Sequence, residues 1–385
     1  MRKVTFYTTI ALAALIAAFM GCGKKDSDVK SGVFVAGTEN GFATLWVNGV
    51  AQRLGNGISP SAANSVFVYG NDVYVAGHEK KVATLWKNGM PQRIKGENST
   101  SSSAASVFVS EGDVYVAGHE QDNNNDNHAI LWKNGVTQRL SGEGSSRADS
   151  VFVSGNDVYV TGESPSNEYD HCAKLWKNGV EQRLGYYISY DGRKNFVDGY
   201  QAASVFVSGS DVYVAGGEGV PSLWKNGVKQ DLKIYFGKEK VAASVFVSGG
   251  DVYVAGCDVW SGWVDPVSGE GWRNATELLS VSRLGKNSEN SVYIEGTFAT
   301  LWKNGVPQLL VGNTKTDNTN TDGNRSWRDE ASNAAGVFVS GDDVYVAGYE
   351  KNAQGKSIAA LWKNGVAQSL SDGSNDAVAN SVFVK

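Results

Sequence analysis

Short apolar runs alternate with polar turns along almost the whole chain, and one stretch of about thirty residues recurs. In residues 202 to 232, AASVFVSGSDVYVAGGEGVPSLWKNGVKQDL, the runs SVFV and DVYV hold consecutive apolar, β-branched and aromatic residues. Such runs predict strands that are covered on both faces. The intervening SGSD, which reads SGND, SGGD or SGDD in other copies, places Gly first in a two-residue loop, which predicts a type II′ hairpin turn.

Each copy continues into LWKNGV, or LWVNGV in the first copy, with Asn-Gly between two strand-like runs in all seven copies. This dipeptide predicts a type I′ turn, in which both central residues have φ > 0. The unit therefore predicts four antiparallel strands: a (SVFV), b (DVYVAG), c (xxLWKN) and d (VxQRL). Among the turns between strands a and b, Glu111-Gly112 has its Gly second, which leaves its turn type open.

The copies of strand a follow one another at spacings of 41, 44, 54, 40, 92 and 45 residues. They begin at Ser65, Ser106, Ser150, Ser204, Ser244, Gly336 and Ser381. A period in the forties with four short strands is typical of propeller blades. The first copy begins at strand b, residues 32 to 37, and the chain ends on a lone strand a, residues 381 to 385. We therefore predict an all-β, seven-bladed β-propeller of four-stranded antiparallel blades, closed by the C-terminal strand joining the N-terminal blade. Closure removes open sheet edges.

This unit resembles the blades of WD-repeat and NHL-repeat propellers, although WKN replaces the Trp-Asp pair and no Gly-His pair opens it. The LWKNG and DVYVAG motifs more closely resemble the repeats of uncharacterised bacterial lipoproteins. The resemblance covers about residues 32 to 385. It concerns the fold, and it implies no known activity.

The first 22 residues, MRKVTFYTTIALAALIAAFMGC, have the layout of a secretory signal. Gly21 before Cys22 resembles a bacterial lipobox, although Phe19 departs from its usual aliphatic residue. We predict a signal peptide over residues 1 to 21, lipidation of Cys22 and a polar tether over residues 22 to 31. The competing interpretation is a transmembrane anchor, for which the apolar run is short. The prediction places the protein in a bacterial cell envelope, as an outer membrane lipoprotein, with the periplasmic and cell-surface sides both open.

Composition narrows the function further. A net charge of −5 and a pI near 5.5 argue against a nucleic-acid partner, which requires a basic face. No nucleophile elbow, phosphate loop, dinucleotide fingerprint or zinc motif is present, so we predict no catalytic residue, no cofactor and no metal. Cys172 and Cys257 lie two blades apart, which favours two free thiols over a disulfide. We expect a monomer.

Loop length varies on only one face. The a–b and c–d turns hardly change, whereas the b–c and d–a connections range from a few residues to about forty. Both variable sets emerge on the same face, where loops display function. We call this the variable face and the opposite one the constant face. Seven of the eleven Trp belong to strand c and are expected to pack between blades. Our ligand-binding candidates are Trp260, Trp263, Trp272, Trp327, Arg273 and Arg325 near blade six, and Tyr186, Tyr187 and Tyr190 before blade five.

Aromatic groups beside Arg and Asn suit stacking on sugar rings or a protein hot spot. The alternative is that the long insertion folds a small core around its Trp. The acidic residues after strand b, such as Glu79 and Glu120, also have two interpretations, acceptors for backbone N–H groups or a cation-binding rim. We predict a membrane-anchored, non-catalytic protein that binds a glycan or a protein ligand on the variable face. A polysaccharide hydrolase or lyase on a propeller, or a structural envelope scaffold, is the alternative.

Overall fold

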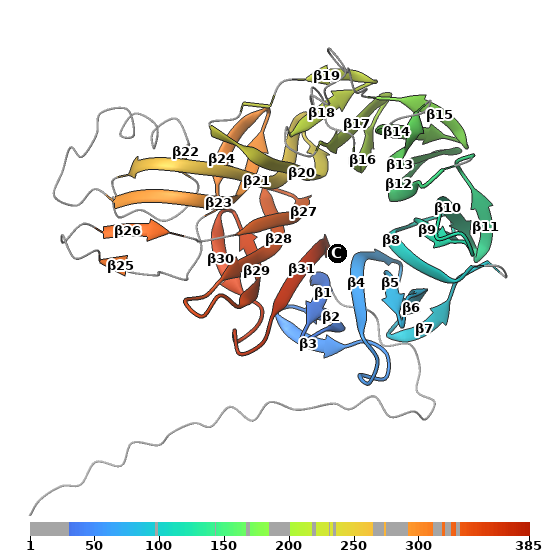
Figure 1. Cartoon of the computed structure of the whole chain (residues 1–385), viewed down its shortest axis with the longest axis horizontal. Coiled ribbons are helices and arrows are strands. Elements are labelled where there is room, and N and C mark those ends of the chain that lie inside the picture. The colour runs from blue at the N-terminus through green and yellow to red at the C-terminus, as the bar shows by residue number, and fades with distance from the viewer. Residues whose placement is uncertain are drawn as a thin grey trace, which may run out of the picture.

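The computed structural model describes residues 31–96, 99–142, 144–166, 170–184, 201–217, 221–230, 232–233, 236–264, 273–274, 292–310, 318–319, 325–328 and 332–385. These residues form seven β-sheets arranged around a central axis (Figure 1), and their strands pair antiparallel except for one parallel pair in the sheet of blade 6. Six sheets have four strands, and the sheet of blade 6 has seven. The predicted seven-bladed propeller is confirmed. No helix in this part of the chain is long and apolar enough to span a membrane.

Each blade is built from strands a, b, c and d, in that order from the axis outwards. Blade 1 has β31 (Ala377–Val384), β1 (Val33–Glu39), β2 (Phe42–Val47) and β3 (Val50–Arg53). Blade 2 has β4 (Ser61–Tyr69), β5 (Asp72–Glu79), β6 (Val82–Lys87) and β7 (Met90–Arg93). Blade 3 has β8 (Ser101–Ser110), β9 (Asp113–Gln121), β10 (Asn127–Lys133) and β11 (Val136–Arg139).

The remaining four blades follow the same order. Blade 4 has β12 (Arg147–Ser154), β13 (Asp157–Ser166), β14 (Asp170–Lys177) and β15 (Val180–Arg183). Blade 5 has β16 (Ala202–Ser208), β17 (Asp211–Gly216), β18 (Ser222–Lys225) and β19 (Val228–Gln230). Blade 6 has β20 (Phe236–Ser248), β21 (Asp251–Val264), β23 (Val292–Lys303) and β24 (Val306–Leu309), with β22 (Arg273–Asn274), β25 (Asn318–Thr319) and β26 (Arg325–Arg328) added. Blade 7 has β27 (Asn333–Ser340), β28 (Asp343–Lys351), β29 (Ser357–Lys363) and β30 (Val366–Ser369).

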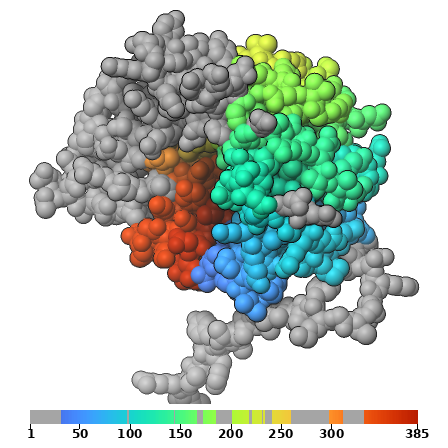
Figure 2. Space-filling model, turned by 45° about the vertical axis from the view of Figure 1, so that its right-hand side comes forward, coloured from blue at the N-terminus to red at the C-terminus, as the bar shows by residue number. Residues whose placement is uncertain are grey.

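The ring closes as predicted, because the last strand of the chain completes the first blade. β31 pairs antiparallel with β1, with Val384 opposite Val33 and Val382 opposite Val35. The backbone of Lys385 also exchanges hydrogen bonds with Gly32. In Figure 2 the parts of the chain coloured blue, cyan and green follow one another in chain order along the visible side of the molecule.

Backbone angles test the predicted turns. All seven Asn-Gly pairs of the c–d turns have φ > 0 at both residues, as the type I′ prediction requires. At the a–b turns of blades 2, 4, 5 and 7, only the first of the two turn residues, a Gly, has φ > 0, which fits type II′. Glu111-Gly112 has φ > 0 at both residues and is therefore type I′. The type II′ prediction is wrong for Gly249-Gly250, since both of these glycines have φ > 0.

Buried tryptophans hold neighbouring blades together. The Trp of strand c is at most 1% exposed in every blade. Strand a carries a β-bulge in every blade, one residue after an invariant, buried Ala. The bulge brings the carbonyl of strand a onto the Gly that ends DVYVAG. At Gly118, a Cβ would lie 2.1 Å from the carbonyl oxygen of Ser103 and 2.9 Å from the Trp132 ring. Only glycine fits this position.

Two circular sets of contacts surround the axis. The Phe of each strand a contacts the Phe of both neighbouring blades, with ring centroids 4.6 to 5.0 Å apart, so that seven rings form a closed circle. In six blades the Ser before this strand's first Val accepts a hydrogen bond from the backbone of the next blade, at 3.1 to 3.3 Å. Gly336 replaces this Ser in blade 7.

The constant face repeats one polar cluster in blades 2 to 7. In blade 4 the Asp157 carboxylate accepts from Asn178 at 2.7 Å and pairs with Lys177 at 2.7 Å, and Lys177 lies over the Tyr159 ring. The same four residue types occupy these positions in all six blades. In each, the hydrogen bond from Lys is the largest cause that lowers the pKa of the Asp. Blade 1 keeps only the Asn, as Asn48, which accepts a hydrogen bond from the Val33 backbone.

Candidate functional site

The tryptophans predicted to bind ligand are carried by extensions of blade 6. Trp260 and Trp263 belong to β21, Arg273 to β22, and Arg325 and Trp327 to β26. The backbone register joins β21 to β23 and β23 to β26. Trp272, Tyr186, Tyr187, Tyr190 and Cys22 lie outside the described residues.

Register places two of these tryptophans close in the sheet. Position 294 of β23 pairs with Gly262 on one side and with Trp327 on the other, and Trp260 pairs with Gly296. Positions two apart along a strand belong to the same face of a sheet, so Trp260 and Trp327 occupy positions of one face and Trp263 a position of the other. The insertion thus lengthens the blade sheet.

A second set of residues lies at the axis, where sequence reasoning proposed no site. Strand a begins and strand b ends on the variable face, and strand a is the innermost strand of each blade (Figure 1). In each blade, the residue just before the invariant Ala of strand a lies beside the residue just after the Gly of strand b. We call these seven pairs the axial ring: Val378 with Thr38, Ala62 with His78, Ser103 with His119, Arg147 with Glu163, Gln201 with Gly217, Val241 with Cys257, and Asn333 with Tyr349.

Charge concentrates in the axial ring at blade 4. The Arg147 Nε atom lies 3.2 Å from Oδ1 of Asp149, the bulge residue, and 3.3 Å from Oε1 of Glu163. Gln201 of blade 5 donates to the other Asp149 oxygen at 3.4 Å. The Arg147 side chain is 41% exposed, against 17% for Asp149 and 13% for Glu163, so an accessible cation covers two shielded carboxylates. Burial raises the pKa of Asp149 to about 6, although the charge of Arg147 opposes this rise.

Two histidines continue the axial ring through blades 2 and 3. His78 Nδ1 lies 3.4 Å from the Ser103 hydroxyl, and Ser103 pairs across the strands with His119. Burial lowers the pKa of both imidazoles, and the charge of Arg147 lowers that of His119 further. Both are therefore neutral at pH 7 and can each donate one hydrogen bond and accept another.

The opposite sector of the axial ring is less charged. Burial raises the pKa of the Cys257 thiol and of the Tyr349 phenol, and each group is therefore neutral at pH 7. Cys172 and Cys257 are both buried and are not joined by a disulfide, as the spacing favoured. β21 continues from Cys257 to Trp260 at about 3.3 Å per residue, so the axial ring and the blade 6 extension share one strand.

Glu120, one of the acidic residues after strand b, acts as an internal hydrogen-bond acceptor. The Glu120 carboxylate accepts from the Gly96 backbone at 2.5 Å and from the Trp132 indole at 3.3 Å. Within the described ranges, no group of three His, Cys, Asp or Glu side chains is placed to hold a metal ion. These contacts agree with a structural role for this carboxylate.

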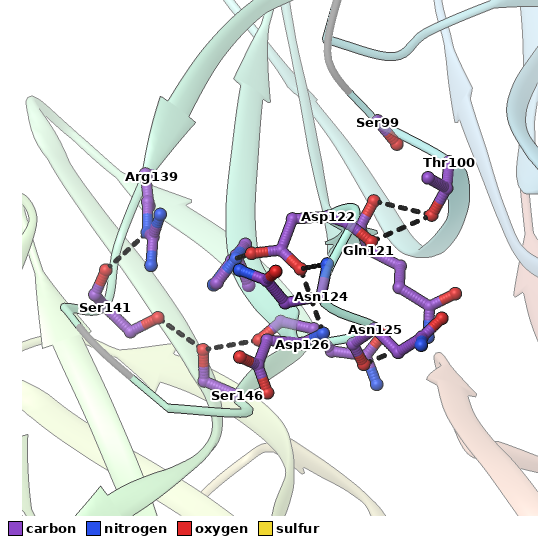
Figure 3. A network of polar contacts seen from close by, with 12 residues as sticks. Ser99, Thr100, Gln121, Asp122, Asn124, Asn125, Asp126, Arg139, Ser141 and Ser146 are labelled. Atoms are coloured by element: carbon purple, nitrogen blue, oxygen red, sulfur yellow. Dashed lines mark hydrogen bonds and ion pairs between the residues drawn. The ribbon is translucent and has the colours of Figure 1, made fainter.

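A network of polar contacts stabilises the b–c loop of blade 3 (Figure 3). Asp122 Oδ1 accepts from the backbones of Asn124 and Asp126, at 2.8 and 3.1 Å, and Oδ2 lies 3.0 Å from His128 Nε2. His128 contributes most to the lowered pKa of the Asp122 carboxylate. Both oxygens of Asp122 have partners in the loop or in the strand that follows it, so the polar run DNNNDN, residues 122 to 127, has a structural explanation.

Comparisons with known proteins identify no family for this chain. No protein-family profile matches the chain, and no curated protein matches it. Among solved structures, the computationally designed Ika8 protein is 15% identical, with a TM-score of 0.42, over 92% of this chain and 91% of that one. The β-propeller domain of the Trilobed protease from Pyrococcus furiosus is 11% identical, with a TM-score of 0.43, over 86% and 87%. The acylaminoacyl peptidase of Pyrococcus horikoshii is 10% identical, with a TM-score of 0.44, over 89% and 50%.

The sequence contains a signal that could have located the axial ring. At the position before the invariant Ala, the seven copies hold Val, Ala, Ser, Arg, Gln, Val and Asn. A position that differs between copies inside an otherwise repeated strand is free of the packing constraint that fixes its neighbours. The β-bulge hides this signal, because it shifts the alternation of inward and outward residues along strand a.

Proposed function

We propose that the chain is a non-catalytic binding protein, anchored in a bacterial envelope through a lipid on Cys22, which captures a glycan on its variable face. The observation that supports this most is the axial ring. Its members differ from blade to blade on a scaffold whose packing residues repeat, and they lie on the face that carries the long connections. A role in packing would favour the same residue in every blade, as it does for Trp, Gly and Ala.

The chemistry of the axial ring suits sugar hydroxyl groups. Arg147 and Gln201 donate, Glu163 accepts, and the neutral His119 does both. Sugar rings also present apolar C–H faces that stack on aromatic side chains. Trp260 and Trp327, which occupy positions of one face of the blade 6 extension, would supply that stacking beyond the axis.

Binding to a glycan array, followed by titration with the best glycan, tests this proposal. Replacing Arg147 by Met or Trp260 by Ala should weaken binding by about 30-fold or more, since loss of a residue at a binding centre costs about 2 kcal/mol. Lys177→Met, on the constant face, is the matched control and should leave the affinity unchanged. If both binding-site variants bind as the unmodified chain does, the variable face is not the glycan site. Capture of a protein but no glycan would favour the protein-ligand alternative.

Anchoring through Cys22 is tested separately. Cys22→Ser should abolish labelling by a radioactive fatty acid and release the protein from the membrane fraction. A Cys22→Ser protein that stays wholly with the membranes would favour a transmembrane anchor.

One observation favours a hydrolase or lyase as the second candidate. Asp149, with a pKa raised to about 6, and Glu163 approach the same Arg147 Nε atom, so a carboxyl group that takes up a proton more readily than usual lies close to a second carboxylate. Against this, Arg147 lies between the two carboxylates, on the side that solvent reaches. Release of reducing ends from a polysaccharide panel, lost in Asp149→Asn, would establish the enzyme; release that persists in Asp149→Asn would exclude Asp149 as its acid.

A further inference from the structure

The chain enters the propeller on the constant face. Strand b of each blade begins at the constant face, and in blade 1 it begins directly after Gly32, which contacts Asn48 of the c–d turn. The Gly32 backbone is also bonded to that of Lys385, at the other end of the chain. The predicted tether, residues 22 to 31, therefore joins the propeller at the constant face.

The short tether limits how the disc can face the membrane. Residues 23 to 31 reach at most about 30 Å when fully extended. The nine residues of β4 span the disc at about 3.3 Å each, also about 30 Å. To bring the variable face to the bilayer, the tether would have to run the whole thickness of the disc. It would also have to pass β21 and β23, which extend further on that side.

Most acidic side chains of the constant face are paired with a cation, which lowers the charge that this acidic protein would bring to an anionic surface. The chain has a net charge of −5. On the constant face, however, each of six Asp carboxylates has a Lys ammonium at 2.7 to 2.8 Å. The a–b turns add the carboxylates Glu111 and Asp342. Asp–Lys pairing thus lowers the electrostatic barrier to the approach of this face to anionic lipid.

The same face exposes a set of aliphatic side chains. The first residue of strand d, next to the Asn-Gly turn, is 57 to 72% exposed in six blades. We call these residues the aliphatic ring: Val50, Met90, Val136, Val180, Val228 and Val366. An exposed apolar residue at the same place in six copies is unlike a single scattered one, and repeated apolar exposure marks an interaction surface. Aliphatic side chains interleaved with Lys suit the interface of a bilayer.

We propose that the constant face rests on the lipid bilayer in which Cys22 is anchored, with the aliphatic ring at the membrane interface and the variable face directed away from it. The proposal rests on the lipid anchor of the proposed function. It explains why loop variation and the axial ring are confined to the far side, because only that side meets a ligand arriving from the medium.

Site-specific fluorescence quenching on vesicles tests the orientation. Cys172 and Cys257 are buried, so a single introduced surface cysteine can be labelled with an environment-sensitive dye. We choose Met90→Cys and Val180→Cys on the aliphatic ring, and Ile58→Cys, which is 81% exposed in a d–a connection of the variable face, as the matched control. The lipidated full chain is reconstituted into phosphatidylcholine–phosphatidylglycerol vesicles that carry nitroxide-labelled headgroups.

We expect quenching at positions 90 and 180 to be at least threefold stronger than at position 58. Equal quenching at all three positions in vesicle-bound protein overturns the orientation and leaves the anchor standing, as does stronger quenching at position 58. If the lipidated chain fails to sediment with vesicles, the anchor itself is refuted and the orientation with it. The Cys22→Ser version of each labelled chain must show no quenching, or the contact does not depend on the tether.

Discussion

The circle of seven phenylalanines gives a direct test of ring closure. Phe383 lies on β31, the strand that closes the ring, and its ring centroid is 5.0 Å from Phe67 and 4.8 Å from Phe338. Phe206 has the same surroundings inside the continuous array, with centroids 4.9 Å from Phe152 and 4.6 Å from Phe246. The two side chains differ only in whether their blade is assembled from both ends of the chain.

Truncation of either ring to Ala should therefore cost the same. Replacing a completely buried Phe by Ala lowers the free energy of unfolding by about 3 to 5 kcal/mol. Both rings are half-buried, which lowers the expected loss in unfolding free energy to about 2 to 3 kcal/mol. Each variant also loses its contacts with two neighbouring Phe rings, so we expect a loss of no less than about 2 kcal/mol.

Urea unfolding followed by Trp fluorescence measures both variants, because the seven buried Trp report on blade packing. The two losses should agree within about 0.5 kcal/mol, which is the usual scatter between independent sites. If Phe206→Ala is destabilised and Phe383→Ala unfolds as the unmodified chain does, β31 does not complete blade 1 in solution. Deletion of residues 377 to 385 should then also be harmless, whereas a closed ring loses several kcal/mol.

Three further predictions concern the packing and titration of single residues. Gly118→Ala should lower the free energy of unfolding by about 1 to 3 kcal/mol, because its Cβ would clash with the Ser103 carbonyl of strand a. Gly142→Ala, with open space around its Cβ, should change the melting temperature little. Equal effects of the two substitutions would contradict the close approach at Gly118. Trp176→Ala should cost about 3 to 5 kcal/mol, and a smaller loss than that of Phe206→Ala in the same urea titration would show that the Trp does not carry the blade interface. The pKa of Asp149 is about 6 in the folded protein and 3.8 in the unfolded chain. Between these values the folded protein holds a proton that the unfolded chain releases. The free energy of unfolding therefore falls as pH rises from about 4 to about 6. Asp149→Asn should lack this fall of about 2 to 3 kcal/mol, measured as the difference between the unfolding free energies at pH 4 and pH 7. Parallel pH profiles of the two proteins would refute the shift.

The sequence by itself determined the fold. Repeated apolar runs, Asn-Gly turns and the split first copy were enough to predict seven four-stranded blades and the pairing of β31 with β1. These features are local and repeat seven times, so each copy confirms the others. The turn at Gly249-Gly250 was the exception, because a pair of glycines can adopt either turn type and the sequence does not choose between them.

Only the tertiary structure revealed the axial ring. Arg147, Glu163 and Gln201 are up to 54 residues apart and belong to two blades, and the variation between copies does not show which side chains come into contact. The bulge in strand a re-aims its first residues, and closure of the ring then brings these ends together around the axis. The face on which the chain enters was likewise decided by assembly, since only pairing of Gly32 with Lys385 fixes it relative to the turns. Sequence periodicity encodes the blade, and the packing of blades around an axis creates the site.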